Sequence, residues 1–553
     1  DFFQLTKNQK FLKKLISPET PYRSIYLYHG VGVGKTCSSI QISQNFKKYY
    51  TKKVLVILQS TLKANYKKQL FDVAKYNSVE DTMVDQCLGN YYLDTITNRK
   101  SIFNEGPDKL KKEINKLIKN EYEFLGYGEF VNLVEKIKEN SINKSRYIDN
   151  IKEYFDDRVI IVDEIHNMRL ITDKEIGKKA PKLFHEVLNI LNNNTLVLLS
   201  ATPMFDNYKE IIFLFNALLI QNKQPIIKQN EVIFDKKGIL EKKFKKKLEK
   251  ISSNFISYMR GENPYTFPIR LYPSINNDKS VLDKKNFPKN DIYGSPIEDD
   301  EQIKHLELIY TEMSRLQNKL YNLVTKDIKK KDLNDDNNNN NNEEVETNKE
   351  WKGQQIVQIS NIIYPTGKIY DNNNKKEIKK DLDIKNIYGE NGFKKIFNIS
   401  DSKKFRVSYK NDEELILKDK LEKYSPKINK IVDYIKNSDG IVLVYSRYLY
   451  SGIIPLAIAL EHLGYNKYGG NSILENNTSK KNNKNYVIIS GNNKLSPNND
   501  KEINICTLKE NKDGNNIKVI IISESGTEGI DLKNIREVHI LEPWYNLNRI
   551  EQV

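Results

Sequence analysis

Cysteine is scarce in this sequence of 553 residues, and its distribution argues against two classes of protein. Its three cysteines are far apart and lack the paired spacing of a zinc site: Cys37, Cys87 and Cys506. Small secreted scaffolds depend on closely spaced disulfides, which this pattern does not provide. The sequence therefore predicts a reducing compartment and no disulfide framework.

Long apolar runs are also missing. No run approaches the roughly 18 residues of a membrane-spanning helix, and the first residues do not read as a signal peptide. We therefore expect no membrane partner. The sequence opens without methionine and stops at Val553 inside what reads as a motif, so we expect a fragment of a longer chain.

Acidic residues are fewer than basic ones. The chain has 89 Lys and Arg against 73 Asp and Glu, a formal net charge of +16. Such an excess favours a polyanionic partner, above all nucleic acid. Abundant Lys, Asn, Ile and Tyr would also follow from an AT-rich genome, so the charge alone leaves both explanations open.

What the sequence does contain is a strand, a glycine loop and a helix in immediate succession. Three glycines and a Lys-Thr pair follow the apolar residues 25–28: Gly30, Gly32, Gly34, Lys35 and Thr36. Such a loop turns backbone N–H groups toward a phosphate, the lysine reaches the β- and γ-phosphates, and the hydroxyl holds Mg²⁺. The strict pattern requires glycine at His29, but the looser helicase form fits. The sequence predicts a site for ATP and Mg²⁺.

Carboxylates follow a second apolar strand, residues 158–162. Asp163 is predicted to hold Mg²⁺ through water, and Glu164 to orient and deprotonate the attacking water. The alternative is a solvated loop start, which the upstream glycine loop disfavours. His166 follows on the same segment.

Small hydroxyl residues end a third predicted strand, residues 195–199. Ser200 and Thr202 are predicted to hydrogen-bond His166 and to couple nucleotide state to the nucleic-acid face. Further hydroxyl and basic residues follow other predicted strands, where open α/β sheets bind ligands. We expect these to contact a nucleic-acid backbone, with ordinary loop polarity as the alternative: Ser60, Thr61, Lys63, Ser446, Arg447, Ser523 and Thr527.

Taken in order, Gly-Lys-Thr, Asp-Glu-Ile-His and Ser-Ala-Thr resemble motifs I, II and III of superfamily 2 helicases and translocases. Residues 523–532 resemble motif V, and the last residues resemble the opening of motif VI. Narrower stretches resemble helicase-like ATPases of nucleocytoplasmic large DNA viruses, those related to the poxvirus early transcription factor small subunit and nucleoside triphosphate phosphohydrolase I: residues 15–22, 163–169, 260–265, 445–447, 452–457 and 542–546. The resemblance covers most of residues 1–275 and 424–553.

The resemblance implies a DNA-dependent ATPase that serves viral transcription in the host cytoplasm or the virion. The expected partners are nucleic acid, DNA rather than RNA, and a viral RNA polymerase or a second transcription-factor subunit. The family pattern places Gln9 at the adenine, with a surface glutamine as the equal alternative. It places Asp531 beside the ribose and Gln552 in the coupling machinery, with the motif VI arginines past Val553.

The expected fold class is α/β, with two RecA-like P-loop domains in tandem, the second incomplete. The domains are predicted at residues 1–220 and 424–553. A mostly helical insertion is predicted between them, at 221–423, with a disordered Asn-rich segment at about 328–350.

Two functions remain open on this evidence. One is an ATP-driven nucleic-acid translocase or helicase. The other is an ATP-regulated DNA-binding subunit of a transcription initiation or termination complex that separates no strands. A metabolic P-loop kinase fits less well, because it needs neither the Ser-Ala-Thr segment nor motif V.

Overall fold

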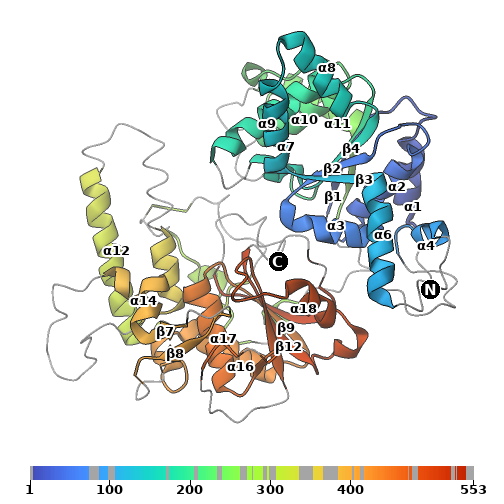
Figure 1. The fold of residues 1–553 in the computed structure, drawn as a ribbon. Helices are drawn as coiled ribbons and strands as arrows, with labels where there is room; N and C mark the ends of the chain where they lie inside the picture. Colours follow the sequence, from blue (N-terminus) through green and yellow to red (C-terminus); the bar gives the residue numbers. More distant parts are fainter. Residues whose placement is uncertain are drawn as a thin grey trace, which may run out of the picture. The chain divides into compact units, whose positions relative to one another are not determined.

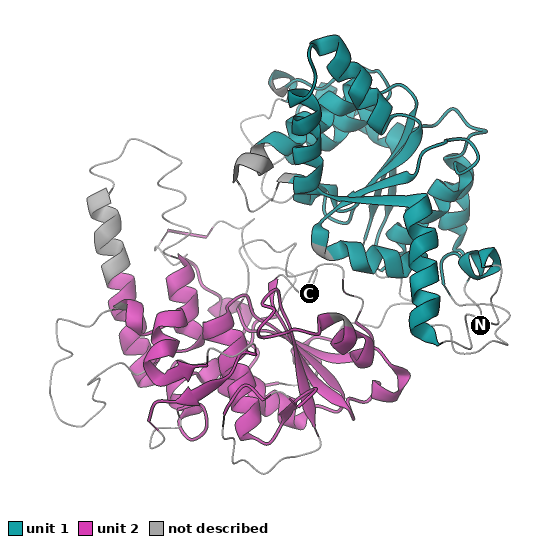
Figure 2. Cartoon of the chain, in the orientation of Figure 1, with its two compact units in different colours: residues 1–269 teal, residues 270–553 magenta. Residues whose placement is uncertain are grey.

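The chain forms two compact units, residues 1–269 and 270–553, shown in two colours in Figure 2. The computed structural model describes residues 4–30, 32–73, 86–96, 106–169, 174–204, 209–232, 240–261, 271–276, 278–290, 295–297, 307–335, 353–364, 384–400, 404–411, 416–470, 472–475, 484–524, 530 and 532–542. Each unit is described by itself below.

A six-stranded parallel sheet forms the centre of the first unit, with strand order β3-β2-β4-β5-β1-β6. Its strands are β1 (Ser24–His29), β2 (Val54–Leu58), β3 (Tyr122–Gly126), β4 (Arg158–Val162), β5 (Asn194–Ser200) and β6 (Ile256–Met259). β2, β4 and β5 are buried along their whole length. Because every pair is parallel, all six carboxyl ends lie at one edge of the sheet.

Helices cover both faces of this sheet (Figure 1). One face packs against α1 (Lys7–Leu15), α2 (Lys35–Asn45), α3 (Lys63–Leu70), α4 (Tyr91–Thr95) and α6 (Pro107–Glu121). The other packs against α7 (Tyr127–Glu139), α8 (Lys144–Phe155), α9 (Lys174–Ile190), α10 (Lys209–Gln221) and α11 (Lys242–Phe255). A strand buried on both faces is a continuous apolar run, which is why the runs in the sequence predicted strands.

A five-stranded parallel sheet forms the centre of the second unit, with strand order β10-β11-β12-β9-β13. Its strands are β9 (Ile441–Tyr445), β10 (Asn466–Lys467), β11 (Asn485–Ile489), β12 (Ile517–Ile522) and β13 (Ile535–Ile540). The accompanying helices are α12 (Arg315–Asp335), α14 (Gly389–Ile396), α15 (Leu421–Tyr424), α16 (Pro426–Asn437), α17 (Ile454–His462) and α18 (Asn499–Cys506). A small antiparallel pair, β7 (Phe397–Ile399) and β8 (Val407–Tyr409), completes it.

Parallel sheets flanked by helices in both units confirm the predicted α/β class. The units divide at 269/270, whereas the sequence placed boundaries at 220/221 and 423/424. α11 and β6 belong to the first sheet, and Leu320, Ile359 and Phe393 share one core with Ile488 of β11. The helix α12 runs to Asp335, inside the segment predicted to be disordered, and residues 336–350 lie outside the described residues.

Within the described parts of the chain, no helix combines the length and the apolar character needed to cross a lipid bilayer.

Cys37 and Cys87 form a disulfide, so the prediction of no disulfide was wrong for this pair. Cys37 lies in the first turn of α2, and Cys87 lies in the segment that leads into α4. Both side chains are buried, and Gln41 of α2 donates a hydrogen bond to the carbonyl oxygen of Cys87 at 2.8 Å. Fifty residues separate the two cysteines. Cysteines that lie so far apart form no recognisable sequence motif, so their pairing could not be predicted before the fold was known.

We expect Cys87→Ser to lower the free energy of unfolding of the first unit by about 2–4 kcal/mol, because the crosslink restricts the unfolded chain. Urea denaturation without reductant measures the difference between wild type and variant. In the presence of a reductant the two proteins should unfold at nearly the same urea concentration. A wild type whose unfolding does not respond to reductant would contradict the prediction.

Candidate active site

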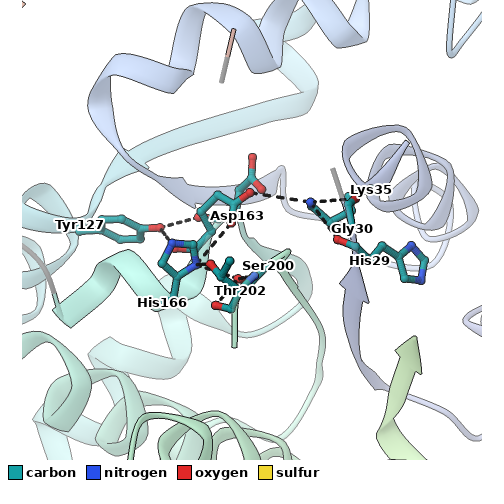
Figure 3. A network of polar contacts seen from close by, with 9 residues as sticks. His29, Gly30, Lys35, Tyr127, Asp163, His166, Ser200 and Thr202 are labelled. Atoms are coloured by element: carbon teal, nitrogen blue, oxygen red, sulfur yellow. Dashed lines mark hydrogen bonds and ion pairs between the residues drawn. The ribbon is translucent and has the colours of Figure 1, made fainter. Parts of the chain in front are cut away.

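Of the residues predicted to act on the nucleotide, Gly30, Lys35 and Asp163 meet at the carboxyl edge of the first sheet (Figure 3). β4, β5 and β1 are neighbours in that sheet, so the segments that follow them lie side by side. The glycine loop follows β1, the carboxylates follow β4, and Ser200 ends β5. Three segments that are far apart in the sequence therefore form one site.

The glycine loop needs glycine for two different physical reasons. Gly34 has φ +80° and caps α2, a left-handed conformation that residues with a side chain rarely adopt. Gly30 has no room for a side chain, because a Cβ there would lie 2.4 Å from the Cα of Gly261. The N–H of Gly30 also donates to the carbonyl oxygen of Met259 at 2.9 Å, so the loop begins against the end of β6.

His29, where the strict pattern requires glycine, points away from the phosphate loop. Its side chain is buried, and its Nε2 lies 2.8 Å from Oγ of Ser257 on β6. Burial, with a smaller contribution from Lys35, lowers the pKa of His29 to about 4. The imidazole is therefore neutral at pH 7 and ties β1 to its edge neighbour.

Lys35, the first residue of α2, turns back over the glycine loop. Its Nζ donates to the carbonyl oxygens of His29 at 3.0 Å and Gly30 at 3.4 Å. The same nitrogen lies 4.0 Å from Oε1 of Glu164. The ammonium group thus lies between the loop and the carboxylates, which suits contact with a terminal phosphate.

Gln9 contacts the end of the glycine loop, where its Nε2 donates to the carbonyl oxygen of Gly34 at 3.4 Å. It is only 5% exposed, which excludes the alternative of a free surface glutamine. Gln9 also forms a capping box with Thr6, so α1 holds it in place. Its contact with adenine stays a prediction. Thr36 lies in the first turn of α2, and its role as a metal ligand likewise stays a prediction.

The two carboxylates differ in their surroundings. Asp163 is 9% exposed, and burial together with the Glu164 charge raises its pKa to about 7, while Lys35 opposes the rise. Glu164 has φ +50°, a left-handed backbone conformation that is uncommon for glutamate. Its Oε2 lies 3.4 Å from Nδ1 of His166, which places the side chain between that histidine and Lys35.

The predicted contacts of His166 are present. Its Nδ1 lies 2.7 Å from Oγ of Ser200 and 3.5 Å from Oγ1 of Thr202. Ser200 also donates to the carbonyl oxygen of Thr202 at 2.9 Å. The end of β5 is therefore connected by hydrogen bonds to the segment that carries Glu164. Coupling through this connection stays a prediction.

Tyr127, the first residue of α7, belongs to the site and was not predicted. Its hydroxyl lies within hydrogen-bond distance of the carbonyl oxygens of both Asp163 and Glu164, the latter at 2.9 Å (Figure 3). The available sequence signal was a strand end that turns into a helix at residues 124–130, but that pattern does not identify the tyrosine.

In the first unit, the residues predicted to contact nucleic acid lie at the same edge of the sheet. Two of them, Lys63 and Ser60, already lie against other residues of the protein. Nζ of Lys63 pairs with Oε2 of Glu129 at 2.6 Å. Ser60 lies close to Gly126, where a Cβ would meet its Oγ at 2.4 Å. The side chain of Thr61 lies outside the described residues.

In the second unit, two of these residues, Ser446 and Arg447, contact a buried glutamate, Glu542. Oγ of Ser446 donates to Glu542 at 2.8 Å, and Nε of Arg447 pairs with Glu524 at 3.1 Å. Ser446 and Ser523 are 1% and 5% exposed, so a direct contact of either side chain with nucleic acid would require a local rearrangement. The remaining predicted residues lie outside the described residues: Thr527, Asp531 and Gln552.

Burial raises the pKa of Glu542 to about 7, against hydrogen bonds from Ser446, the N–H of Arg447 and Asn361 and the charge of Lys427, which lower it. The folded-state pKa exceeds the unfolded value of 4.5. Between these two pH values the folded protein therefore keeps a proton on Glu542 that the unfolded chain has released. This group therefore stabilises the fold fully below about pH 4.5, and its contribution, about 3 kcal/mol, is lost as pH rises through 7.

We expect the stability difference between wild type and Glu542→Gln to shift in favour of the variant between pH 4.5 and pH 8. The amide carries no charge at either pH, so it avoids the cost of burying a carboxylate. Urea denaturation of the second unit at both pH values measures the shift. A difference that does not change with pH would show that folding leaves the pKa of Glu542 unshifted.

Comparisons with known proteins found a matching family and several similar proteins. Residues 4–205 match the family described as type III restriction enzyme, res subunit. A predicted ATP-dependent RNA helicase of Acanthamoeba polyphaga mimivirus is 28% identical, over 99% of this chain and 77% of its own length. Nucleoside triphosphatase I of Heliothis armigera entomopoxvirus is 23% identical, over 99% of this chain and 68% of its own length. The helicase domain of Pyrococcus furiosus Hef aligns with 99% of this chain and 92% of that domain, at 12% identity and a TM-score of 0.38.

The chain spans about half the length of two other relatives, predicted helicases of mimivirus and of invertebrate iridescent virus 3, at 49% and 46%.

Proposed function

We propose that this chain, a superfamily 2 helicase-like ATPase related to those of nucleocytoplasmic large DNA viruses, couples ATP hydrolysis in its first unit to movement along DNA during viral transcription. The observation that carries the proposal is the meeting of Lys35, Glu164 and His166 at the carboxyl ends of β1 and β4, the two strands that flank β5. Transfer of a phosphoryl group to water needs a cation at the phosphate and a carboxylate at the water. The hydrogen-bonded histidine is the group that would couple this reaction to the rest of the unit.

The residues present fit ATP with Mg²⁺. The carboxylate of Asp163 and the hydroxyl of Thr36 are oxygen donors, which Mg²⁺ prefers, and a buried carboxylate is costly to ionise without a cation nearby. Bound Mg²⁺ would neutralise charge on the β- and γ-phosphates. Lys35 would bind the terminal phosphate, and Glu164 would accept the proton of the attacking water. The hydrogen bond between His166 and Ser200 would couple a movement of the carboxylate segment during hydrolysis to the end of β5.

Nucleic acid is the proposed partner. The +16 net charge favours a polyanion, and Lys63 and Arg447 lie just after β2 and β9, at the carboxyl ends of their own sheets. The relatives' names include ATP-dependent RNA helicases and a termination factor homologue of African swine fever virus, which supports nucleic acid as the partner. We place the chain in the cytoplasm of the infected cell or in the virion, alongside a viral RNA polymerase or a second transcription-factor subunit.

Steady-state ATP hydrolysis should be measured alone and with double-stranded DNA, single-stranded DNA and RNA, over a range of salt concentrations. We expect stimulation, strongest with DNA, that falls as salt rises, because contacts to phosphates release counterions. Stronger stimulation by RNA would overturn the DNA assignment. Turnover that no nucleic acid changes would overturn the proposal as a whole.

A strand-displacement assay on the same protein separates the two candidate activities. Displacement driven by ATP supports a helicase. Stimulated hydrolysis without displacement, combined with nucleotide-dependent DNA affinity, would instead favour the ATP-regulated DNA-binding subunit.

A further inference from the structure

We infer that Tyr127 is a positioning residue that holds the general base Glu164 in its working orientation and links it to the nucleic-acid edge of the first unit. The inference rests on the proposed function of the site. It concerns a residue that lies outside the glycine loop, the carboxylate segment and the Ser-Ala-Thr segment. Three independent features of the structure support it.

The first feature is where the Tyr127 hydroxyl points. It donates to the carbonyl oxygen of Asp163 and lies 2.9 Å from that of Glu164. These carbonyls belong to the two peptide groups on either side of the Glu164 Cα. Holding both peptide groups fixes φ and ψ of Glu164, and with them the direction of its Cα–Cβ bond. The tyrosine ring is 4% exposed, so its own position is set by packing.

The second feature is the conformation that is held. Glu164 has φ +50°, and a non-glycine residue keeps such a conformation only where its surroundings impose it. Asn167 donates its N–H to the same Glu164 carbonyl at 2.8 Å, so two donors converge on one oxygen. Strained residues of this kind cluster at functional sites, where the strain is part of the preorganisation.

The third feature is that, among the described residues, the Glu164 carboxylate has only long contacts with other side chains. Its Oε2 is buried and accepts no hydrogen bond from the part of the chain that the structure describes, and Nδ1 of His166 lies 3.4 Å away. Its Oε1 lies 4.0 Å from Nζ of Lys35, at the limit of an ion pair. The carboxylate is thus aimed mainly by its backbone, and that backbone is held by Tyr127.

A chain of contacts connects Tyr127 to the predicted nucleic-acid residues. Tyr127 follows Gly126, whose N–H donates to Oε2 of Glu129 at 2.7 Å. The same oxygen accepts from Nζ of Lys63 at 2.6 Å. A nucleic-acid phosphate would compete with Glu129 for Lys63. Such competition would change the hydrogen bond between Glu129 and the N–H of Gly126. Because Tyr127 follows Gly126 directly, the position of Tyr127, and with it that of Glu164, would also change.

Tyr127→Phe tests the positioning role, because it removes the hydroxyl and keeps the ring. We expect kcat for stimulated ATP hydrolysis to fall about 10²-fold, as misplaced catalytic groups do, while KM for ATP changes less than about twofold. The matched control is Tyr147→Phe. Tyr147 lies on α8 in the same core, its ring is similarly buried, and its hydroxyl does not contact Asp163 or Glu164. This control should leave both parameters unchanged.

Equal turnover in the two tyrosine variants would overturn the inference. A loss of turnover together with a loss of affinity for a fluorescent ATP analogue would also overturn it, because it would indicate a structural role. A wild-type protein that does not hydrolyse ATP at all would instead count against the proposed function. The two failures are therefore distinguishable.

The link to the nucleic-acid edge is tested by a double-mutant cycle of Tyr127→Phe and Glu129→Gln, read as the ratio of stimulated to basal turnover. If both residues act along one path, the double variant should lose no more of that ratio than Tyr127→Phe alone. Losses that multiply would overturn the link and leave only the positioning role.

Discussion

Replacing Lys35 with alanine should abolish ATP turnover and leave the first unit folded. Among the described residues, the ammonium group donates to the backbone carbonyls of His29 and Gly30 and pairs at a distance with Glu164, so it contributes charge rather than core packing. Loss of one preorganised donor at developing charge costs on the order of 10²–10³ in kcat, and a full positive charge should cost at least as much. Steady-state hydrolysis and a thermal melting curve measure the two halves of the prediction.

Lys52→Ala is the matched control for Lys35→Ala. Lys52 also donates to backbone carbonyls, those of Lys152 and Asp156 at 3.4 and 3.0 Å among them, but it precedes β2 at the opposite edge of the sheet. We expect Lys52→Ala to melt at a lower temperature and to hydrolyse ATP normally. Normal turnover in the Lys35 variant with an unchanged melting curve would remove the assignment of the glycine loop.

Glu164→Gln should leave ATP binding intact and slow hydrolysis by about 10²–10⁴-fold, because an amide cannot accept the proton of the attacking water. The change keeps the size of the side chain. Tyr127 contacts the backbone carbonyl of residue 164, which the substitution does not change, so the left-handed backbone should persist. Equilibrium binding of a fluorescent ATP analogue and single-turnover hydrolysis separate the two effects.

Glu121→Gln provides the comparison for Glu164→Gln. Glu121 ends α6 at the opposite edge of the sheet, where it accepts hydrogen bonds from Tyr91 and Tyr92 at 2.6 and 2.9 Å. Its replacement should not change turnover. If Glu164→Gln hydrolyses ATP as fast as Glu121→Gln, another residue is the general base.

The parts of the fold that could be predicted are those that local sequence determines. β4 and β5 contain runs of Val, Ile and Leu, and the structure places them at residues 158–162 and 194–200, against the predicted 158–162 and 195–199. The nucleotide residues follow such runs directly. Once the strands are known to be parallel, the meeting of Asp163 with Lys35 follows from strand order.

The parts that escaped prediction depend on contacts between distant segments. β6 reads Ile-Ser-Tyr-Met, is only partly buried and has no apolar run, so its place beside β1 is set by tertiary pairing. Tyr127 is one tyrosine among 33, and only the fold shows that its hydroxyl reaches the carboxylate segment. Helices α12 and α14 share a core with β11 through side chains that show no strand-like pattern of their own.

The contact between Gly30 and Gly261 sets the shortest fragment that should behave as an autonomous ATPase module. A fragment that ends at residue 205, where the family match ends, contains Lys35, Asp163 and Glu164. It lacks β6, so β1 becomes an open sheet edge, a template for association with other chains. The N–H of Gly30 would lose its acceptor at Met259, and His29 would lose Ser257. A soluble minimal module must therefore extend through Gly261.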